Sequence, residues 1–243
     1  MADGNAQRSQ LRGADAIAAA IDAGQPVRLV FVLEGPLSQS ARALLHLCKA
    51  AGIQVRSVAE REMKRMSADP RPQALLALVG DDPEASLDAL LSARGTLWLL
   101  SGVAYPGNAG FAIRTAEVSG AAGIIIDASF DHAGRRQALR AGMRADRLFP
   151  VLFARGSDVV PRARAAGHRI VGIEDRGTHA PWQVDLTGPV LFVVGGEARG
   201  VPRPLLDACD CVIRIPMLGF IPSYNLQAAT AIVTGERLRQ LGT

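Results

Sequence analysis

Polar residues that could hold a ligand stand at three places where an apolar run passes into a glycine-rich loop. Asn108 and Arg114 lie in PGNAGFAIRTA, Glu197 lies in GGEARG directly after the run LFVV, and Ser223 and Asn225 follow the run CVIRIPM. Amide and hydroxyl groups donate and accept hydrogen bonds, a carboxylate accepts them, and a guanidinium binds phosphate oxygens in pairs. Free backbone amides at a helix start also favour an anion. The pattern indicates a ligand pocket built from loops.

Each place also has a purely structural interpretation. Asn108 can cap the helix that starts there, Arg114 can pair with a surface acid, and Glu197 can anchor a backbone amide. Ser223 or Asn225 can cap the last helix, and the glycines can mark tight turns. The spacing G-G-x-x-x-G late in the chain disfavours a Rossmann dinucleotide site. The residue pattern leaves pocket and turns as open alternatives.

The elements that would position these residues form two α/β units. In the first, residues 1–12 read as a polar tail, and strands at 28–33, 53–58 and 74–79 alternate with helices at 13–23, 38–51 and 59–66. In the second, strands at 96–100, 124–126, 150–153, 169–173 and 191–194 alternate with helices at 109–119 and 159–166 and with an arginine-rich stretch at 135–147. The alternation in the second unit predicts a parallel sheet with helices on both faces. We place the boundary at residues 1–94 and 95–243, after the linker Asp81-Asp82-Pro83.

Composition limits the partners. The chain has 243 residues, a net charge of +4 and two basic clusters, with seven basic residues against three acidic ones at 42–71 and nine arginines against three aspartates at 131–169. Such clusters favour a phosphate-rich partner. No apolar stretch reaches the roughly 18 residues of a membrane span, and the N-terminus lacks the apolar core of a signal peptide. The histidines and cysteines show no ligand spacing. We expect a cytoplasmic protein with neither metal nor membrane partner.

Taken together in this order, the three motifs resemble the SpoU/TrmH family of the SPOUT superfamily of RNA methyltransferases. The matching positions are Asn108, Gly110, Arg114, Gly195, Glu197, Gly200, Ile215, Pro216, Met217, Gly219, Ser223 and Asn225. The resemblance covers about residues 96–240, and the N-terminal module looks, more loosely, like the family's substrate-binding domain. It implies an α/β parallel sheet whose C-terminal part is threaded into a trefoil knot, one of the rare exceptions to unknotted topology.

The resemblance also implies a function and its residues. The enzyme would transfer a methyl group from S-adenosyl-L-methionine to a ribose 2′-hydroxyl of tRNA or rRNA, as a homodimer with the site shared at the interface. The acceptor ribose would be surrounded by Asn108, Arg114, Glu197, Ser223 and Asn225. The cofactor would be held by Val194, Gly195, Gly196, Glu197, Ile215, Met217, Ser223, Tyr224, Asn225 and Leu226.

Departures from the family pattern concern the acceptor. Tyr224 stands where leucine is usual, Gln227 follows Leu226, and Gly142 and Arg144 fall in the family's Arg-Ala-Ser-x-Gly stretch. A tyrosine here could stack on a base or fill the core. Three acceptors therefore stay open: tRNA or rRNA in general, one large-subunit rRNA nucleotide as in an antibiotic-resistance methylase, and a small molecule. A binding module without catalysis is disfavoured because all the candidate catalytic residues are present.

Overall fold

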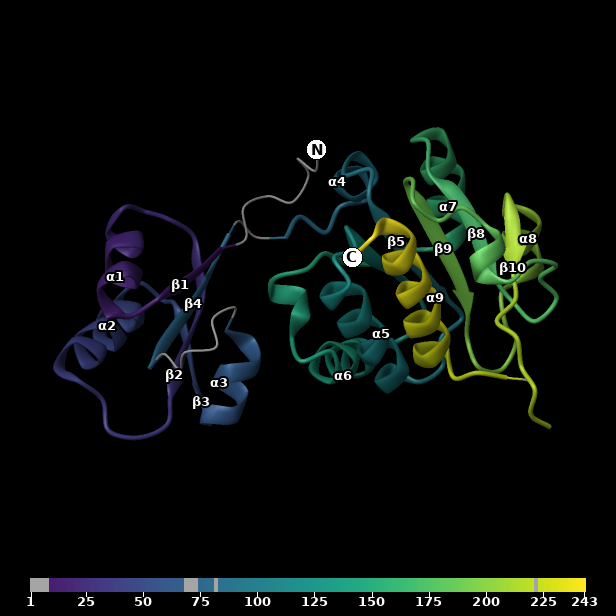
Figure 1. Cartoon of the computed structure of the whole chain (residues 1–243). Helices are drawn as coiled ribbons and strands as arrows, with labels where there is room; N and C mark the ends of the chain where they lie inside the picture. Colours follow the sequence, from purple (N-terminus) through teal and green to yellow (C-terminus); the bar gives the residue numbers. More distant parts are fainter. Residues whose placement is uncertain (1–8, 68–73, 81–82, 221–222) are drawn as a thin grey trace. The chain divides into compact units, whose positions relative to one another are not determined.

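The structure is a computed structural model that describes residues 9–67, 74–80, 83–220 and 223–243. It forms two units, Met1–Asp82 and Pro83–Thr243, which are taken separately below (Figure 1). Asp69 and Arg71 of the first basic cluster and Asp81 and Asp82 of the expected linker lie outside the described residues, as does the side chain of Arg65.

The N-terminal unit is a four-stranded sheet in the order β1-β4-β2-β3. β2 and β3 are parallel, whereas β4 is antiparallel to both β2 and β1. Its elements are β1 (Ser9–Arg12), α1 (Ala14–Asp22), β2 (Val27–Leu33), α2 (Gln39–Ala50), β3 (Gln54–Val58), α3 (Glu60–Met66) and β4 (Leu75–Val79). The prediction of a polar tail was wrong for residues 9–12. This edge strand carries only one large apolar residue, so it gives no alternating pattern to detect.

Side-chain alternation along β2 explains the layers of this unit. Val30 and Val32 pack with α1 and α2, whereas Leu29 and Phe31 face the side on which Met63 of α3 lies. Successive side chains of a strand point to opposite faces, so one apolar strand can support helices on both sides. Ser38 caps α2, its hydroxyl accepting from the Ala41 amide at 3.1 Å.

The C-terminal unit is a six-stranded sheet in the order β10-β8-β9-β5-β6-β7, and all its strand pairs are parallel. The strands are β5 (Thr96–Ser101), β6 (Gly123–Asp127), β7 (Val151–Phe153), β8 (Arg169–Ile173), β9 (Val190–Gly195) and β10 (Cys211–Ile213). The helices are α4 (Leu87–Ser92), α5 (Pro106–Val118), α6 (His132–Ala141), α7 (Gly156–Ala165), α8 (Arg203–Asp207) and α9 (Leu226–Leu241), with short 3-10 turns η1 (Ala145–Arg147) and η2 (Pro181–Gln183). The predicted parallel sheet is confirmed.

Helices cover both faces of this sheet, as predicted. Trp98 and Phe192, stacked with ring centroids 4.7 Å apart, face α5, α6 and α9. Leu99 and Val193, one residue further along the same strands, face α4, α7 and α8. Because α4 adds buried leucines to this second core, the units divide between residues 82 and 83, earlier than the boundary at 94/95 that the sequence suggested.

The strands all end at one edge of the sheet, and their register aligns the residues there. Gly195 of β9 pairs with Ser101 of β5, and Ser101 pairs with Asp127 of β6. Phe153 at the end of β7 pairs with Ile126. The loops at the carboxyl ends of parallel strands are the usual place for binding sites, and all three predicted motifs follow this edge. The trefoil knot is a separate property of the chain path and stays a prediction.

Candidate active site

A cavity of about 260 Å³ lies at the carboxyl ends of β8 and β9 and beside the first turn of α9. Nine of the ten predicted cofactor residues line it: Val194, Gly195, Gly196, Glu197, Ile215, Met217, Ser223, Tyr224 and Leu226. The sequence analysis did not assign the other lining residues to the cofactor, namely Ile173, Glu174, Asp175, Gly200 and Ala229. The first three come at and directly after the end of a predicted strand, so the rule that placed the other motifs could have found them.

The glycines of the β9 loop are required by contacts between loops. A Cβ on Gly195 would lie 1.9 Å from the Gly200 carbonyl carbon, and one on Gly196 would lie 1.9 Å from the Gly102 carbonyl oxygen. Gly196 also donates its amide to the Ser101 carbonyl at 2.7 Å. Gly200 has φ +63°, which favours glycine. Glycine is therefore required at these positions for packing between the loops of the cavity wall, besides the access for a ligand that the sequence suggested.

Glu174 ties the β8 loop to the β9 loop. Its carboxylate accepts a hydrogen bond from the Val201 amide at 2.8 Å, and a Cβ on Gly200 would lie 2.5 Å from the same oxygen. The Glu174 amide in turn donates to the Ile213 carbonyl at the end of β10. Glu174, which is half-buried, thus connects the ends of β8 and β10 to the β9 loop through its backbone amide and its carboxylate.

A polar network joins the three sequence motifs at the cavity mouth. Glu197 accepts from the side-chain amide of Asn108 and, at 3.2 Å, from the backbone amide of Ala104. The Asn108 side-chain oxygen Oδ1 accepts from the Asn225 side-chain amide at 3.3 Å. Because a carboxylate only accepts, Glu197 fixes the orientation of the Asn108 amide and hence that of Asn225. Residues more than 80 positions apart in the sequence are brought into hydrogen-bonding contact here.

The structure shows at the start of α9 which residue caps the last helix. Asn225 is the N-cap, and its side-chain oxygen accepts from the Gln227 amide at 2.9 Å. Its capping and network roles use different atoms, so the structural and functional interpretations hold together. Ser223 is exposed and lines the cavity, and Tyr224 is 43% exposed, which excludes the core-filling interpretation.

Arg114 is not brought to the cavity within one chain. It lies on α5, six residues after Asn108, with an exposed side chain, and it does not line the cavity. Phe111 and Val118 of the same helix are 51% and 78% exposed, and the spacing i, i+3, i+7 places them on one side of the helix with Arg114. α9 packs beside α5 and adds Ile232, 38% exposed. Arg114 therefore stands on a partly apolar outer surface.

The charge of the cavity wall is negative. Glu174, Asp175 and Glu197 line it, and no lysine, arginine or histidine does among the described residues. Apolar side chains, including Val194, Ile215 and Leu226, make up the inner wall. A ligand with positive charge and an apolar ring system suits such a cavity.

Tyr224 lines the cavity, but the other residues that depart from the family pattern, Gly142, Arg144 and Gln227, lie elsewhere. A Cβ on Gly110 would lie 2.8 Å from the Gly142 amide nitrogen, and one on Gly142 would lie 3.1 Å from the Gly110 carbonyl oxygen, so small residues let α5 and the end of α6 approach. Arg144 has φ +61° and forms an ion pair with Asp146 at 3.2 Å. Gln227 is half-buried in the first turn of α9. None of the three lines the cavity.

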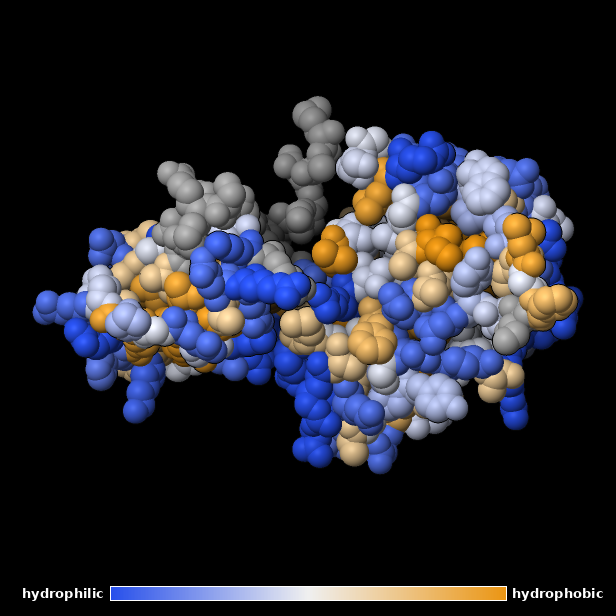
Figure 2. Space-filling view, turned by 60° about the horizontal axis from the view of Figure 1, so that its bottom comes forward, coloured by the Kyte–Doolittle hydropathy of each residue, from blue (hydrophilic) through white to orange (hydrophobic). Residues whose placement is uncertain are grey.

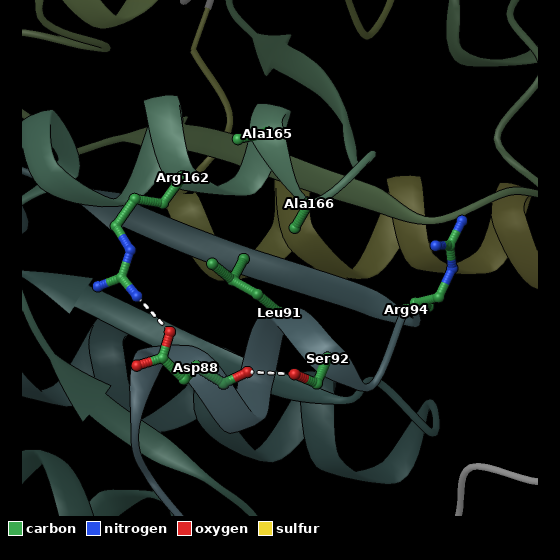
Figure 3. Close-up of a pocket in the computed structure, with 7 residues that line it drawn as sticks. All are labelled: Asp88, Leu91, Ser92, Arg94, Arg162, Ala165 and Ala166. Atoms are coloured by element: carbon green, nitrogen blue, oxygen red, sulfur yellow. Dashed lines mark hydrogen bonds and ion pairs between the residues drawn. The ribbon is translucent and has the colours of Figure 1, made fainter.

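A second depression lies between α4 and α7, near the opposite edge of the sheet (Figure 3). Its charged groups include Asp88 and Arg162, which form an ion pair with each other across it, and the Ser92 hydroxyl donates to the Asp88 carbonyl at 2.8 Å. None of the three sequence motifs reaches it. In the described part of the chain no cluster of three potential metal ligands occurs, and no helix is long and apolar enough to cross a membrane.

Comparisons with known proteins match both units. A model of the SpoU rRNA Methylase family matches residues 96–235, and a model described as RNA 2′-O ribose methyltransferase substrate binding matches residues 11–84. The chain is 31% identical over 231 residues to 23S rRNA (guanosine-2′-O-)-methyltransferase RlmB of Photobacterium profundum, which covers 91% of this chain and 94% of that protein.

Solved structures give the same picture. The SpoU methyltransferase AviRb from Streptomyces viridochromogenes aligns with a TM-score of 0.62 and 27% identity over 96% of this chain and 89% of its own. An AdoMet-bound rRNA methyltransferase from Sinorhizobium meliloti aligns with a TM-score of 0.61 and 26% identity over 96% of this chain and 88% of its own.

Proposed function

Because the chain belongs to the SpoU rRNA methylase family, we propose that it transfers the methyl group of S-adenosylmethionine to a ribose 2′-hydroxyl of ribosomal RNA. The observation that carries this proposal is the meeting of Glu197, Asn108 and Asn225 at the mouth of a cavity lined by the β9 and β10 loops. A cofactor cavity and a set of hydrogen-bonding groups for an acceptor hydroxyl are thereby adjacent.

The cavity fits the cofactor in charge and in the apolar character of its inner wall. Its carboxylates suit the sulfonium and ammonium charges, and its apolar inner wall suits the adenine ring. The loops that carry Gly195, Gly196, Ile215 and Met217 would hold it, with Leu226 behind them. When bound, the cofactor supplies an already activated methyl group. The protein then has to align the acceptor hydroxyl and help it lose its proton.

The acceptor side is assigned to Asn108, Glu197, Ser223 and Asn225, with Arg114. A guanidinium keeps its proton in proteins, so Arg114 is a poor general base. We assign it to gripping the phosphate next to the acceptor ribose and to stabilising the developing alkoxide. The hydroxyl proton leaves through that phosphate or through water. Lysine at position 114 should then retain part of the activity, whereas an unchanged rate in Arg114→Ala would remove this residue from the mechanism.

A homodimer would bring Arg114 to the site. The outer surface of α5 that carries Arg114 also exposes Phe111 and Val118, and α9, which packs beside α5, exposes Ile232. Exposed apolar side chains grouped around a polar residue favour association with another copy. We infer that a second copy packs against this surface and that the Arg114 of one copy serves the cavity of the other.

The acceptor is RNA, and the small-molecule alternative is not supported. The substrate-binding model covers the described N-terminal unit almost entirely, and the relative from Photobacterium profundum is a 23S rRNA methyltransferase by name. We further propose that the specific acceptor is a nucleotide of ribosomal RNA and that the protein acts in the cytoplasm, where that RNA is found. Whether the methylation confers antibiotic resistance stays a prediction of the family resemblance.

Methyl transfer from labelled S-adenosylmethionine to protein-free ribosomal RNA, followed by nucleoside analysis, tests the proposal. A 2′-O-methylated nucleoside is the expected product. Label on a base, or label only in tRNA, would show that the proposed acceptor is wrong and would identify another acceptor. Absence of both cofactor binding and transfer would overturn the proposed function.

A further inference from the structure

We propose that Arg135 and Arg155 form a phosphate-binding track at the carboxyl end of β7, which holds the RNA strand on the side of the acceptor away from the cofactor. The inference rests on the proposed function and adds where the RNA backbone runs. It concerns the second basic cluster, whose exposed arginines the cavity does not use.

The order of the strands places the cofactor cavity, the acceptor network and the end of β7 one after another along one edge of the sheet. The cofactor cavity lies at β8 and β9, and the acceptor network joins the loops after β9 and β5. β6 and then β7 continue the sheet in the same direction. Because neighbouring strands are about 4.8 Å apart, the end of β7 lies about 10 Å from the end of β5. Phosphates of a stacked strand are about 3.4 Å apart along its axis, so this distance corresponds to about three nucleotides.

Arg135 and Arg155 flank the end of β7 from its two faces. Arg135, in the first turn of α6, places its guanidinium over the Phe153 ring, 4.6 Å from the ring centroid. This contact uses the flat face of the guanidinium and leaves its N–H edge for a phosphate. Arg155 follows Phe153 by two residues as the exposed N-cap of α7. The two cations therefore share one short segment of the edge.

Nearby carboxylates are occupied by the backbone or by hydroxyl groups. Asp127 accepts from the Gly156 amide at 2.9 Å and from the Ser101 hydroxyl at 3.3 Å. Asp131 caps α6 by accepting from the Gly134 amide at 2.7 Å, and Asp158 accepts from the Ser157 hydroxyl. No ion pair within the described residues involves Arg135 or Arg155. Their positive charge thus remains available to a partner.

The surface at this edge suits a polar polymer. Asp131, Arg135, Arg155 and Asp158 around the end of β7 are all exposed. Figure 2 shows that hydrophilic side chains are also common on one face of the molecule, with hydrophobic groups between them. Nucleic-acid interfaces are more polar and more positive than protein interfaces. The track is therefore assigned to the RNA backbone, and a second protein copy at this edge is the competing occupant that the test must exclude.

The test compares the full chain with the variant Arg135→Gln/Arg155→Gln. The matched control is Arg94→Gln, an exposed arginine before β5, at the opposite edge of the sheet, without an ion pair to any described residue. Binding of a labelled single-stranded oligouridylate is measured across salt concentrations, together with the KM for ribosomal RNA and the affinity for S-adenosylmethionine. Each lost contact to a single strand should lower the slope of log K against log salt by about 0.7, hence by about 1.4 for the pair.

We expect the double variant to show this smaller slope and a higher KM for RNA, with kcat, cofactor affinity and elution volume unchanged, and we expect Arg94→Gln to match the wild type. An unchanged slope in the double variant would overturn the track, as would an equal loss in Arg94→Gln. A changed elution volume with normal RNA binding would assign the edge to a protein partner. Since oligouridylate binding needs no methyl transfer, failure of the track and failure of the proposed function are distinguishable.

Discussion

Substitution of Gly196 by alanine should disrupt the cofactor cavity while leaving the sheet folded. The added Cβ would lie 1.9 Å from the Gly102 carbonyl oxygen, where real contacts stay above 3.0 Å. One of the two loops must therefore move by about 1 Å. Both are tethered, since the Gly196 amide donates to Ser101 at 2.7 Å and the Gly102 amide donates to the Asp127 carbonyl at 2.8 Å.

The magnitude follows from these contacts. Overpacking in a close-packed region costs about 1–3 kcal/mol, and a backbone hydrogen bond lost with it adds about 1 kcal/mol. If the displaced loop regains its position only when ligand binds, about 2–4 kcal/mol is taken from the cofactor binding free energy. Since 1.4 kcal/mol is about tenfold, the affinity for S-adenosylmethionine should fall by about 30-fold to 700-fold.

Titration calorimetry with S-adenosylmethionine measures this affinity, and Gly188→Ala is the matched control. Gly188 precedes the same strand, β9, at its other end, and a Cβ there would meet nothing within 4 Å. Its variant should bind as the wild type does. Wild-type affinity in Gly196→Ala would refute the steric argument, and so would an equal loss in Gly188→Ala.

Three further predictions address the acceptor groups and the core. Glu197→Gln offers one acceptor oxygen to two donors, so a charge-assisted hydrogen bond worth about 1.5–3 kcal/mol is lost. The value of kcat/KM should therefore fall about 10-fold to 150-fold. A rate within twofold of the wild type would contradict the orienting role of Glu197. Mixing inactive Arg114→Ala with inactive Glu197→Ala should restore about a quarter of wild-type activity, if half the dimers are mixed and each mixed dimer has one complete site. No recovery in dimers verified as mixed would contradict a shared site. Burial lowers the pKa of His168 below its ordinary 6.5, so the native state disfavours the protonated form. The free energy of unfolding should therefore be highest above pH 6.5 and should decline as the pH falls below 6.5. Urea unfolding of the wild type and of His168→Leu at several pH values checks this, and an equally steep decline in the variant would show that other groups cause it.

Much of the fold could be predicted from local pattern. Apolar runs bounded by glycine located all five predicted strands of the second unit, because strands buried on both faces are nearly continuous in apolar residues. β1 and β10 were harder. β1 is a four-residue edge strand with one large apolar residue, and β10 covers only Cys211–Ile213 of the apolar run that continues to Met217. At such edges pairing partners decide the strand, and these are distant in sequence.

The candidate site was predicted in part. Motif order and resemblance located Glu197, Asn108 and Asn225, and the structure joins them by hydrogen bonds. Glu174 was missed because it belongs to no recognised motif, although it meets the Val201 amide and thereby positions the β9 loop. Whether Arg114 reaches a cavity depends on a second copy, which a single chain does not contain.

By itself the sequence determined the residue types, their order along the chain and the strand ends that carry them, since these depend on local hydrophobic pattern and turn chemistry. Tertiary structure alone decided which interpretation of each motif holds: that Asn225 both caps α9 and reaches Asn108, that Tyr224 is exposed, and that the glycines let the backbones of different loops approach closely. The physical reason is that parallel strands bring their carboxyl ends to one edge. Hydrogen-bond partners and steric contacts there come from positions far apart in the chain, which no local pattern encodes.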